Sequence, residues 1–210
     1  MSRTNVRLGV FFMILWLNGA FGAGKTTVAH ELARRLPGAF IYDPEEVGYF
    51  LRKNLPAAMD RPDFQDIPLW WELNYPILAT LSREHPGPII VPMTLVNEDY
   101  CRVLPGRLAG EGIGLVHVIL SARRETLVKR LRKRNLGWLN REAFALDAMD
   151  RCLAFFAEGR WGVPVETDGK PVGRVVEEVA ALAGLSLLPE DRSPLRQRLA
   201  RAAVWRAHIR

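Results

Sequence analysis

The sequence predicts a three-layer α/β fold, in which a five-stranded parallel sheet carries helices on both faces. Short apolar runs bounded by turn residues alternate with longer stretches of helical apolar spacing, which is the pattern of repeated βαβ units. A chain of 210 residues, 49% hydrophobic and 25% charged, can bury the core of one such domain. We expect this domain at residues 1–186, followed by a basic C-terminal helix at 187–210.

Five apolar runs are the expected strands. They lie at residues 10–17, 39–42, 88–92, 114–120 and 163–166. The first, VFFMILWL, is apolar throughout, which favours a central strand buried on both faces. Residues 1–12 resemble the start of a signal peptide, but cleavage nearby would destroy the glycine-rich motif that follows. We interpret them as an extension of the domain, or as residues added by a start site placed too early, since Met13 lies inside the apolar run and still leaves MILWLNG before the glycine-rich motif.

The expected helices fill the intervals between the strands. They lie at residues 25–36, 45–54, 67–84, 98–110, 124–134, 141–157 and 172–183. In the third helix, Asp66 is a candidate N-cap and Pro68 falls in the first turn, where proline is tolerated.

The segment GAFGAGKT matches the phosphate-loop template G-x-x-x-x-G-K-[ST]. It joins the first strand to the first helix, so backbone N–H groups and the positive helix N-terminus can hold an anion. Lys25 would reach the β- and γ-phosphates of ATP, and the Thr26 hydroxyl would bind Mg²⁺. The alternative is an ordinary glycine-rich turn before a helix. The residues expected to bind the nucleotide here are Gly19, Ala20, Phe21, Gly22, Ala23, Gly24, Lys25, Thr26 and Thr27.

Asp43 stands at the carboxyl end of the second strand, on the side where ligands of such sheets bind. Its carboxylate could accept the proton of a substrate hydroxyl or hold Mg²⁺. No acidic residue follows the third strand to take the metal role instead. The alternative is the acidic start of a helix, because Glu45 and Glu46 come directly after it.

Arginines gather between the fourth and fifth strands. Arg130 and Arg134 share a helix face, and Arg151 lies on the next helix. We expect a lid at about residues 135–144 that closes over ATP, with arginines neutralising the transferring phosphoryl group. The alternative is a solvated basic helix face. After the fifth strand, the loop with Asp168 and Gly169 is expected to flank the purine base.

Composition narrows the classes of function. The two cysteines lie far apart, which favours a reducing compartment, and the four histidines lack the spacing of zinc ligands. The net charge is +6, but no nucleic-acid-binding module occurs, so we assign the charge to phosphate contacts and the tail. The tail is a weakly amphipathic helix that lies either on an anionic membrane surface or back on the domain.

Six segments, in this order, resemble the ATP-binding tunicamycin-resistance proteins of bacteria, within the nucleoside-monophosphate-kinase-like phosphate-loop group. They are WLNGAFGAGKT, YDPEEVGYFLR, DFQDIPLW, IIVPMTLV, ETLVKRLRKR and DRC. The resemblance runs from about Met13 almost to the C-terminus. It implies a cytoplasmic kinase-like protein that binds ATP and Mg²⁺, with membrane contact through its C-terminal segment. The substrate-binding residues that we expect on these segments are Asp43, Arg52, Trp70 and Thr94, and the alternative for Trp70 is a core aromatic.

Two functions follow from the resemblance. The first is a small-molecule phosphotransferase that acts on tunicamycin or a related uridine nucleotide. The second is a protein that binds and sequesters the drug, with ATP as a structural or gating ligand. In the first, the residues with catalytic roles would be Lys25, Asp43, Arg130, Arg134 and Arg151.

Overall fold

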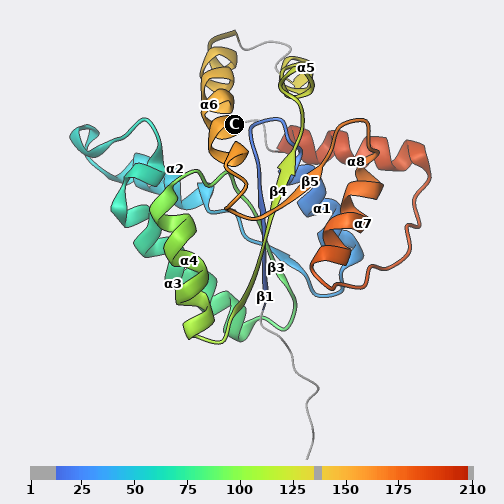
Figure 1. Ribbon diagram of the computed structural model, residues 1–210, viewed down its shortest axis with the longest axis horizontal. Helices are drawn as coiled ribbons and strands as arrows, with labels where there is room; N and C mark the ends of the chain where they lie inside the picture. Colours follow the sequence, from blue (N-terminus) through green and yellow to red (C-terminus); the bar gives the residue numbers. More distant parts are fainter. Residues whose placement is uncertain (1–12, 135–138, 208–210) are drawn as a thin grey trace, which may run out of the picture.

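The computed structural model describes residues 13–134 and 139–207 (Figure 1). Its centre is a five-stranded sheet in the order β2-β3-β1-β4-β5, and every neighbouring pair is parallel. The predicted three-layer α/β fold is therefore confirmed. The strands are β1 Met13–Asn18, β2 Phe40–Ile41, β3 Ile89–Pro92, β4 Gly114–Ser121 and β5 Val163–Glu166.

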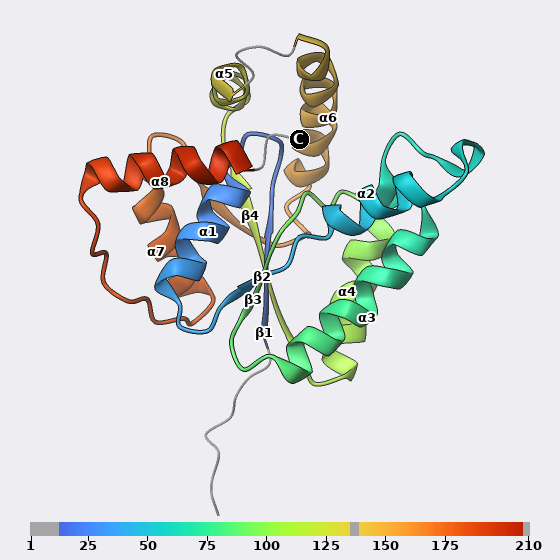
Figure 2. The ribbon, with the colours of Figure 1, turned by 180° about the vertical axis from the view of Figure 1, so that it is seen from behind.

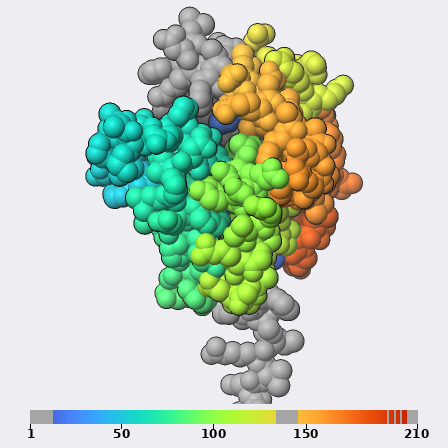
Figure 3. All heavy atoms as spheres, turned by 60° about the vertical axis from the view of Figure 1, so that its left-hand side comes forward, coloured from blue at the N-terminus to red at the C-terminus, as the bar shows by residue number. Residues whose placement is uncertain are grey.

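Helices cover both faces of the sheet. Figures 1 and 2 show α1, α7 and α8 on one side and α2, α3 and α4 on the other, while α5 and α6 stand above the carboxyl ends of the strands. In Figure 3 the second group, coloured teal to green, lies beside the orange α6. The helices are α1 Lys25–Arg35, α2 Glu45–Asn54, α3 Pro68–Glu84, α4 Glu98–Gly110, α5 Arg124–Arg134, α6 Leu139–Ala157, α7 Val172–Leu182 and α8 Pro194–Ala207, with 3₁₀ turns η1 Ala57–Met59 and η2 Phe64–Asp66.

Strand β1 lies at the centre of the sheet, as its unbroken apolar sequence predicts. It pairs with β3 on one side and β4 on the other. Successive side chains of a strand point to opposite faces. Leu15 and Leu17 therefore join the core under α1 and α7, whereas Ile14 and Trp16 join the core under α3 and α4. Residues 10–12 of the expected strand lie outside the described residues.

The order of the strands positions a ligand site. From β1 the chain passes to β2 and β3 on one side of the sheet and then to β4 and β5 on the other. The connections after β1 and β3 thus leave in opposite directions, and the crevice at such a reversal is where open α/β sheets bind ligands. Both connections begin at the carboxyl ends of buried strands, so the fold brings the glycine-rich loop and the loop after β3 together.

The start of α3 differs from the expectation in one detail. Asp66 does not cap α3, because it belongs to η2, and the N-cap of α3 is Ile67 without a side-chain hydrogen bond. Asp63 instead caps η2 by accepting a hydrogen bond from the Gln65 backbone N–H. Pro68 does stand in the first turn of α3, as expected.

Helix α8 lies within the segment expected to form the basic tail, where helical spacing places Leu195, Leu199 and Ala202 on one face. Leu195 and Leu199 are 67% and 63% exposed, so these side chains do not pack on the domain. Among the helices of the described ranges, none combines the length and the apolar composition that a membrane crossing requires.

Candidate nucleotide site

The loop between β1 and α1 has the backbone geometry of an anion cradle. Gly24 is the N-cap of α1 in the left-handed conformation, with φ 104°, and no side chain caps the helix. The N–H groups of the first turn are thus left for a ligand, which the positive end of the helix also attracts when it is an anion. Gly19 has φ 138°, and a Cβ there would lie 2.4 Å from the carbonyl oxygen of Leu120. Only glycine fits that position.

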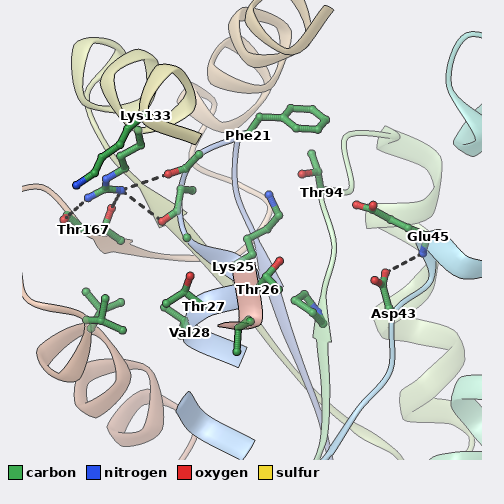
Figure 4. Close-up of a pocket in the computed structure, with 18 of the residues that line it drawn as sticks. Phe21, Lys25, Thr26, Thr27, Val28, Asp43, Glu45, Thr94, Lys133 and Thr167 are labelled. Carbon is green, nitrogen blue, oxygen red and sulfur yellow. Dashed lines mark hydrogen bonds between the residues drawn. The ribbon is translucent and has the colours of Figure 1, made fainter. Parts of the chain in front are cut away.

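Lys25 folds back over this loop. Its Nζ donates hydrogen bonds to the carbonyl oxygens of Gly19, at 2.9 Å, and Ala20, at 3.2 Å. It also lies 5.6 Å from the centroid of the Phe21 ring. The ammonium group therefore stands inside the cradle, where the phosphates of a nucleotide would give it a charged partner in place of neutral carbonyls. Figure 4 shows Lys25 between Phe21 and Thr26.

The side chain of Asn18 fixes the base of the loop. Its Oδ1 accepts hydrogen bonds from the backbone N–H groups of Gly19, at 2.8 Å, and Leu95, at 2.9 Å. Its Nδ2 donates to the carbonyl oxygen of Leu95 at 2.8 Å and lies 3.0 Å from Nε2 of His117. Asn18 is completely buried. One carboxamide thus ties the glycine-rich loop to the segment after β3 and to β4.

Thr94 makes a second link between these segments. Its hydroxyl donates to the Gly19 carbonyl oxygen at 3.0 Å, and its own carbonyl oxygen accepts from Nε2 of Gln65 at 3.1 Å. Thr94 stands close to the place where many phosphate-loop proteins carry a metal-binding aspartate. The structure thus brings Thr94 to the site, although its side chain is 4% exposed and mainly supports the loop.

A cleft of about 740 Å³ extends over the cradle (Figure 4). Its walls come from α1, the ends of β2 and β3, α5, the loop after β5, α7 and α8. The predicted nucleotide-binding residues from Phe21 to Thr27 line it, and so do Asp43 and Thr94. Gly19 and Ala20 lie beneath as the carbonyl acceptors of Lys25.

Asp43 and Glu45 form an acidic side of the cleft, across from Lys25 in Figure 4. Oδ1 of Asp43 accepts a hydrogen bond from the Glu45 backbone N–H at 3.0 Å. The carboxylate therefore accepts a hydrogen bond at the start of α2 and also lines the cleft. Its position agrees both with a helix-start role and with a role toward a ligand. Burial, and then the charge of Asp43, raise the pKa of the neighbouring Tyr42 hydroxyl.

Carboxylate and hydroxyl oxygens are the protein ligands that Mg²⁺ accepts, and it keeps several waters and phosphate oxygens besides. Thr26, Asp43 and Glu45 line the cleft and supply such oxygens. Within residues 13–134 and 139–207, no group of three or more acidic, histidine or cysteine side chains could hold a metal ion without further ligands. The donor set thus fits a magnesium ion that arrives with nucleotide phosphates.

The arginines predicted to reach phosphate have different surroundings. Arg130 donates to the Thr167 hydroxyl and to the Thr167 carbonyl oxygen, each at 2.9 Å, and so closes the cleft on the β5 side. Arg151 lines a smaller cavity nearby. Arg134 ends α5, and nothing is described of its side chain. Of the expected lid at 135–144, residues 135–138 lie outside the described residues and 139–144 begin α6.

The smaller cavity, of about 150 Å³, adjoins the large cleft. Both are lined by Phe21, Glu45, Tyr49 and Thr94. The remaining lining residues come from α2, the η2 region, the end of β3 and α6. They include the predicted Arg52, whose guanidinium donates to the carbonyl oxygens of Arg61 and Pro62 at 3.1 and 2.8 Å. Arg52 also lies 5.4 Å from the centroid of the Phe64 ring.

Like Gly19 and Ala20, the predicted residues Trp70, Asp168 and Gly169 do not line either cavity. Trp70 is completely buried, and its Nε1 donates to the carbonyl oxygen of Pro44 at 3.0 Å, so it is the core aromatic of the alternative interpretation. Asp168 turns toward Arg123, whose backbone N–H and Nε donate to Oδ2 at 2.8 and 3.0 Å. Gly169 follows it, while their neighbours Thr167 and Lys170 do line the large cleft.

Sequence reasoning missed several residues of the site. Lys133, Thr167 and Lys170 line the large cleft. Asn18, Gln65 and His117 support it through hydrogen bonds. A polar residue at the end of an apolar strand, immediately before the glycines, was the available signal for Asn18.

Comparisons with known proteins agree with this geometry. A family model described as an AAA domain matches residues 14–158. The solved structure of the Deinococcus radiodurans tunicamycin resistance protein is 33% identical, with 84% of this chain and 99% of that chain covered and a TM-score of 0.68. No curated protein matches the chain significantly.

Two kinases share the fold at lower identity. A gluconokinase from Sinorhizobium meliloti 1021 is 20% identical over 94% of this chain and 99% of that chain, with a TM-score of 0.60. The shikimate kinase from Bacteroides thetaiotaomicron is 21% identical over 82% and 99%, with a TM-score of 0.53. At these identities the likeness shows the fold alone.

We predict that Lys25→Ala abolishes detectable binding of Mg-ATP and leaves the fold intact. In the empty protein the ammonium donates to the carbonyl oxygens of Gly19 and Ala20, so its loss should change the free energy of unfolding by no more than about 1 kcal/mol. Calorimetric titration with Mg-ATP and thermal unfolding measure the two effects. Wild-type affinity in the variant would overturn the assignment of the phosphate cradle.

We also predict that the protein becomes less stable as the pH falls, because of His117. Burial lowers the pKa of this imidazole to about 4, because the charged form is poorly solvated. The pKa of His117 is lower in the folded protein than in the unfolded chain. Its contribution to the free energy of unfolding is therefore complete above about pH 6.5 and declines as the pH falls toward 4. Chemical denaturation at pH 7.5 and 5.5 should show a loss of about 1 kcal/mol in the free energy of unfolding.

His117→Gln should remove most of this loss, because an amide oxygen can still accept the Asn18 N–H but does not titrate. His85→Gln, at the Phe40 edge of the sheet, is the matched control and should keep the wild-type loss. The same loss in His117→Gln would contradict the role of His117.

Proposed function

Since the chain belongs to the AAA domain family of phosphate-loop proteins, and to the family of the tunicamycin resistance protein, we propose that it confers tunicamycin resistance by phosphoryl transfer from ATP. The nucleotide-binding, kinase-like fold is established by the comparisons and by the sheet. The acceptor in this proposal is a hydroxyl of tunicamycin or of a related uridine nucleotide.

One observation carries the proposal. The phosphate cradle opens into the large cleft, and a separate smaller cavity meets that cleft at shared residues beside Lys25 and Asp43. A transferase needs two ligands whose reacting atoms lie within about 3 to 3.5 Å of each other. Two adjoining cavities with the cradle at their junction meet this requirement, whereas a protein that binds a nucleotide alone needs only the first.

In the proposed reaction, the acceptor oxygen forms a bond to the γ-phosphorus as the bond from that phosphorus to the β-γ bridging oxygen breaks. Lys25 neutralises charge on the transferring group, and Arg130 and Lys133 add positive charge from α5. The Asp43 carboxylate takes the proton of the acceptor hydroxyl or orients it. Mg²⁺, held by Thr26 and the acidic side of the cleft, would supply charge neutralisation at the phosphates.

The smaller cavity is the proposed acceptor site. It combines rings from Phe21, Tyr49 and Phe64 with the guanidinium groups of Arg52 and Arg151. Aromatic faces suit a pyrimidine ring, and guanidinium groups suit sugar and phosphate oxygens. Its volume is below that of pockets that enclose a drug-sized ligand, so it would hold one part of the antibiotic.

Residues outside the cavities take supporting roles in the proposal. Trp70 is a positioning residue, because its indole N–H holds Pro44 next to Asp43. Asp168 and Gly169 keep the loop after β5 in place beside the base, with Asp168 bound to Arg123. Arg134 remains a candidate phosphate ligand through its place on α5.

Sequestration of the drug without phosphoryl transfer is the second candidate function, with ATP as a structural or gating ligand. The end of β3 favours it, because β3 ends at Pro92 and is followed by Met93 and Thr94 rather than by a metal-binding carboxylate. Asp43 then remains a helix-start residue rather than a catalytic residue. In either function, ATP and Mg²⁺ place the protein in the cytoplasm, with the basic C-terminal helix as the contact to the inner face of the membrane.

Mass spectrometry of tunicamycin after incubation with the protein and Mg-ATP decides between the two functions. Phosphoryl transfer predicts drug that carries one added phosphate, in amounts exceeding the protein, with release of an equal amount of ADP. Tight binding of unmodified drug would overturn transfer and support sequestration. Incubation with Lys25→Ala is the control for contaminating kinases.

We predict that Asp43→Asn lowers turnover by about 100-fold and changes ATP affinity much less. The amide oxygen can still accept the Glu45 N–H, so the start of α2 is kept, while the basicity and charge are lost. Steady-state release of ADP in the presence of drug measures the effect. Glu46→Gln, an exposed change on the same helix turn, is the matched control and should retain wild-type turnover. Unchanged turnover in Asp43→Asn would reduce Asp43 to a structural role.

A further inference from the structure

Helix α8 reaches the large cleft. Ala202 and Val204, near its C-terminal end, line the same cavity as the phosphate cradle. Figures 1 and 2 show α8 lying across the ends of α1 and α7, with its last turns toward the centre of the molecule. The tail therefore contributes to the wall of the large cleft, although Leu195 and Leu199 on the same helix are exposed.

The lining of the cleft divides into two kinds of surface. Around Lys25 it carries hydroxyl, carboxylate and ammonium groups from the strand ends and the first turn of α1. Another part of the lining carries aliphatic side chains from three helices, with the polar side chains of Thr167 and Lys170 on the loop before α7. Figure 4 shows Val28 on the side of Thr27 that is away from Phe21. The aliphatic residues are Val28 of α1, Val172 and Val175 of α7, and Ala202 and Val204 of α8.

A second observation fixes α8 to the helix that carries the cradle. The segment before α8 forms ion pairs with the outer side of α1, in which Arg34 contacts Glu190 and Asp191, and Arg192 contacts Glu31. Arg192 and Glu31 are 17% and 10% exposed, so this pair is only weakly screened by solvent.

Backbone contacts strengthen the same attachment. The Leu188 N–H donates to the Arg35 carbonyl oxygen at 2.8 Å, and Nε of Arg35 donates to the Leu188 carbonyl oxygen at 2.7 Å. Near the start of α8, Nε2 of Gln197 donates to the Arg192 carbonyl oxygen at 3.1 Å. We call these ion pairs and hydrogen bonds between α1 and residues 188–192 the clasp. Because α1 begins at the cradle, the clasp sets the position of α8 relative to bound phosphates.

We propose that α8 is part of the nucleotide site and that its Ala202 and Val204 form, with α7 and Val28, the apolar wall that contacts the base of ATP. The inference rests on the proposed binding of ATP. A nucleoside triphosphate has a charged end and a flat base of largely apolar faces, and the two surfaces of the cleft match these two ends in chemistry. Bound base covers Val172, Ala202 and Val204, which are accessible to water in the empty cleft, whereas Val28 and Val175 are already buried behind them.

The test compares Mg-ATP with inorganic tripolyphosphate, which has the phosphates but no base. Ala202→Gln should weaken binding of Mg-ATP about fivefold to tenfold, as expected when an amide replaces an apolar contact, and change tripolyphosphate affinity less than twofold. Ala203→Gln makes the same chemical change on the neighbouring exposed residue outside the lining, so both affinities should stay at the wild-type values. Calorimetric titration of the full-length variants measures both ligands.

A second pair of variants tests the clasp. Arg192→Gln removes the partner of Glu31 and should weaken Mg-ATP severalfold with little effect on tripolyphosphate. Arg174→Gln removes exposed ion pairs on α7 and is the control. Wild-type or tighter ATP binding in Ala202→Gln, or equal losses for both ligands, would overturn the role of α8. Failure of the wild-type protein to bind either ligand would instead contradict the proposed function.

Discussion

The site depends on the buried carboxamide of Asn18. A buried amide must satisfy its donors and acceptor, and here it does so by joining three segments that are far apart in the sequence. Gly19 takes its strained conformation directly after this residue, and Thr94 then bonds to the Gly19 carbonyl oxygen. The cradle is therefore preorganised by the sheet below it, which lowers the entropy that a bound anion must restrict.

Most of the fold could be predicted from the sequence because its signals are local. Apolar runs and helical spacing indicated five strands and eight helices, and an uninterrupted run identified β1 as the central strand. The phosphate cradle could also be predicted, since the glycines, Lys25 and Thr26 are adjacent in the chain. Boundaries shifted by one or two residues, because strand ends depend on pairing partners: β2 pairs only at Phe40 and Ile41.

Contacts between distant segments could not be predicted in this way. Lys133, Thr167 and Lys170 reach the cleft through the packing of α5 and the loop after β5, and no local pattern marks them. Trp70 shows the opposite case, because its neighbours in the sequence resemble a ligand platform while its ring fills the core under Pro44. In the tail, the helical spacing left open what the helix contacts, and the ion pairs that join the segment before α8 to α1 could not be predicted from it.

The sheet separates two cores, one under α1 and α7 and the other under α3 and α4. Nucleotide contacts fall mainly on the first side, and the smaller cavity falls mainly on the second. The paired strands and helix α6 both connect the two cores, since α6 contributes Cys152 to the first and Phe155 to the second. Under the proposed function, acceptor contacts and phosphate contacts thus fall largely on different sides of the sheet. One domain thus holds two largely separate surfaces, one on each side of its sheet.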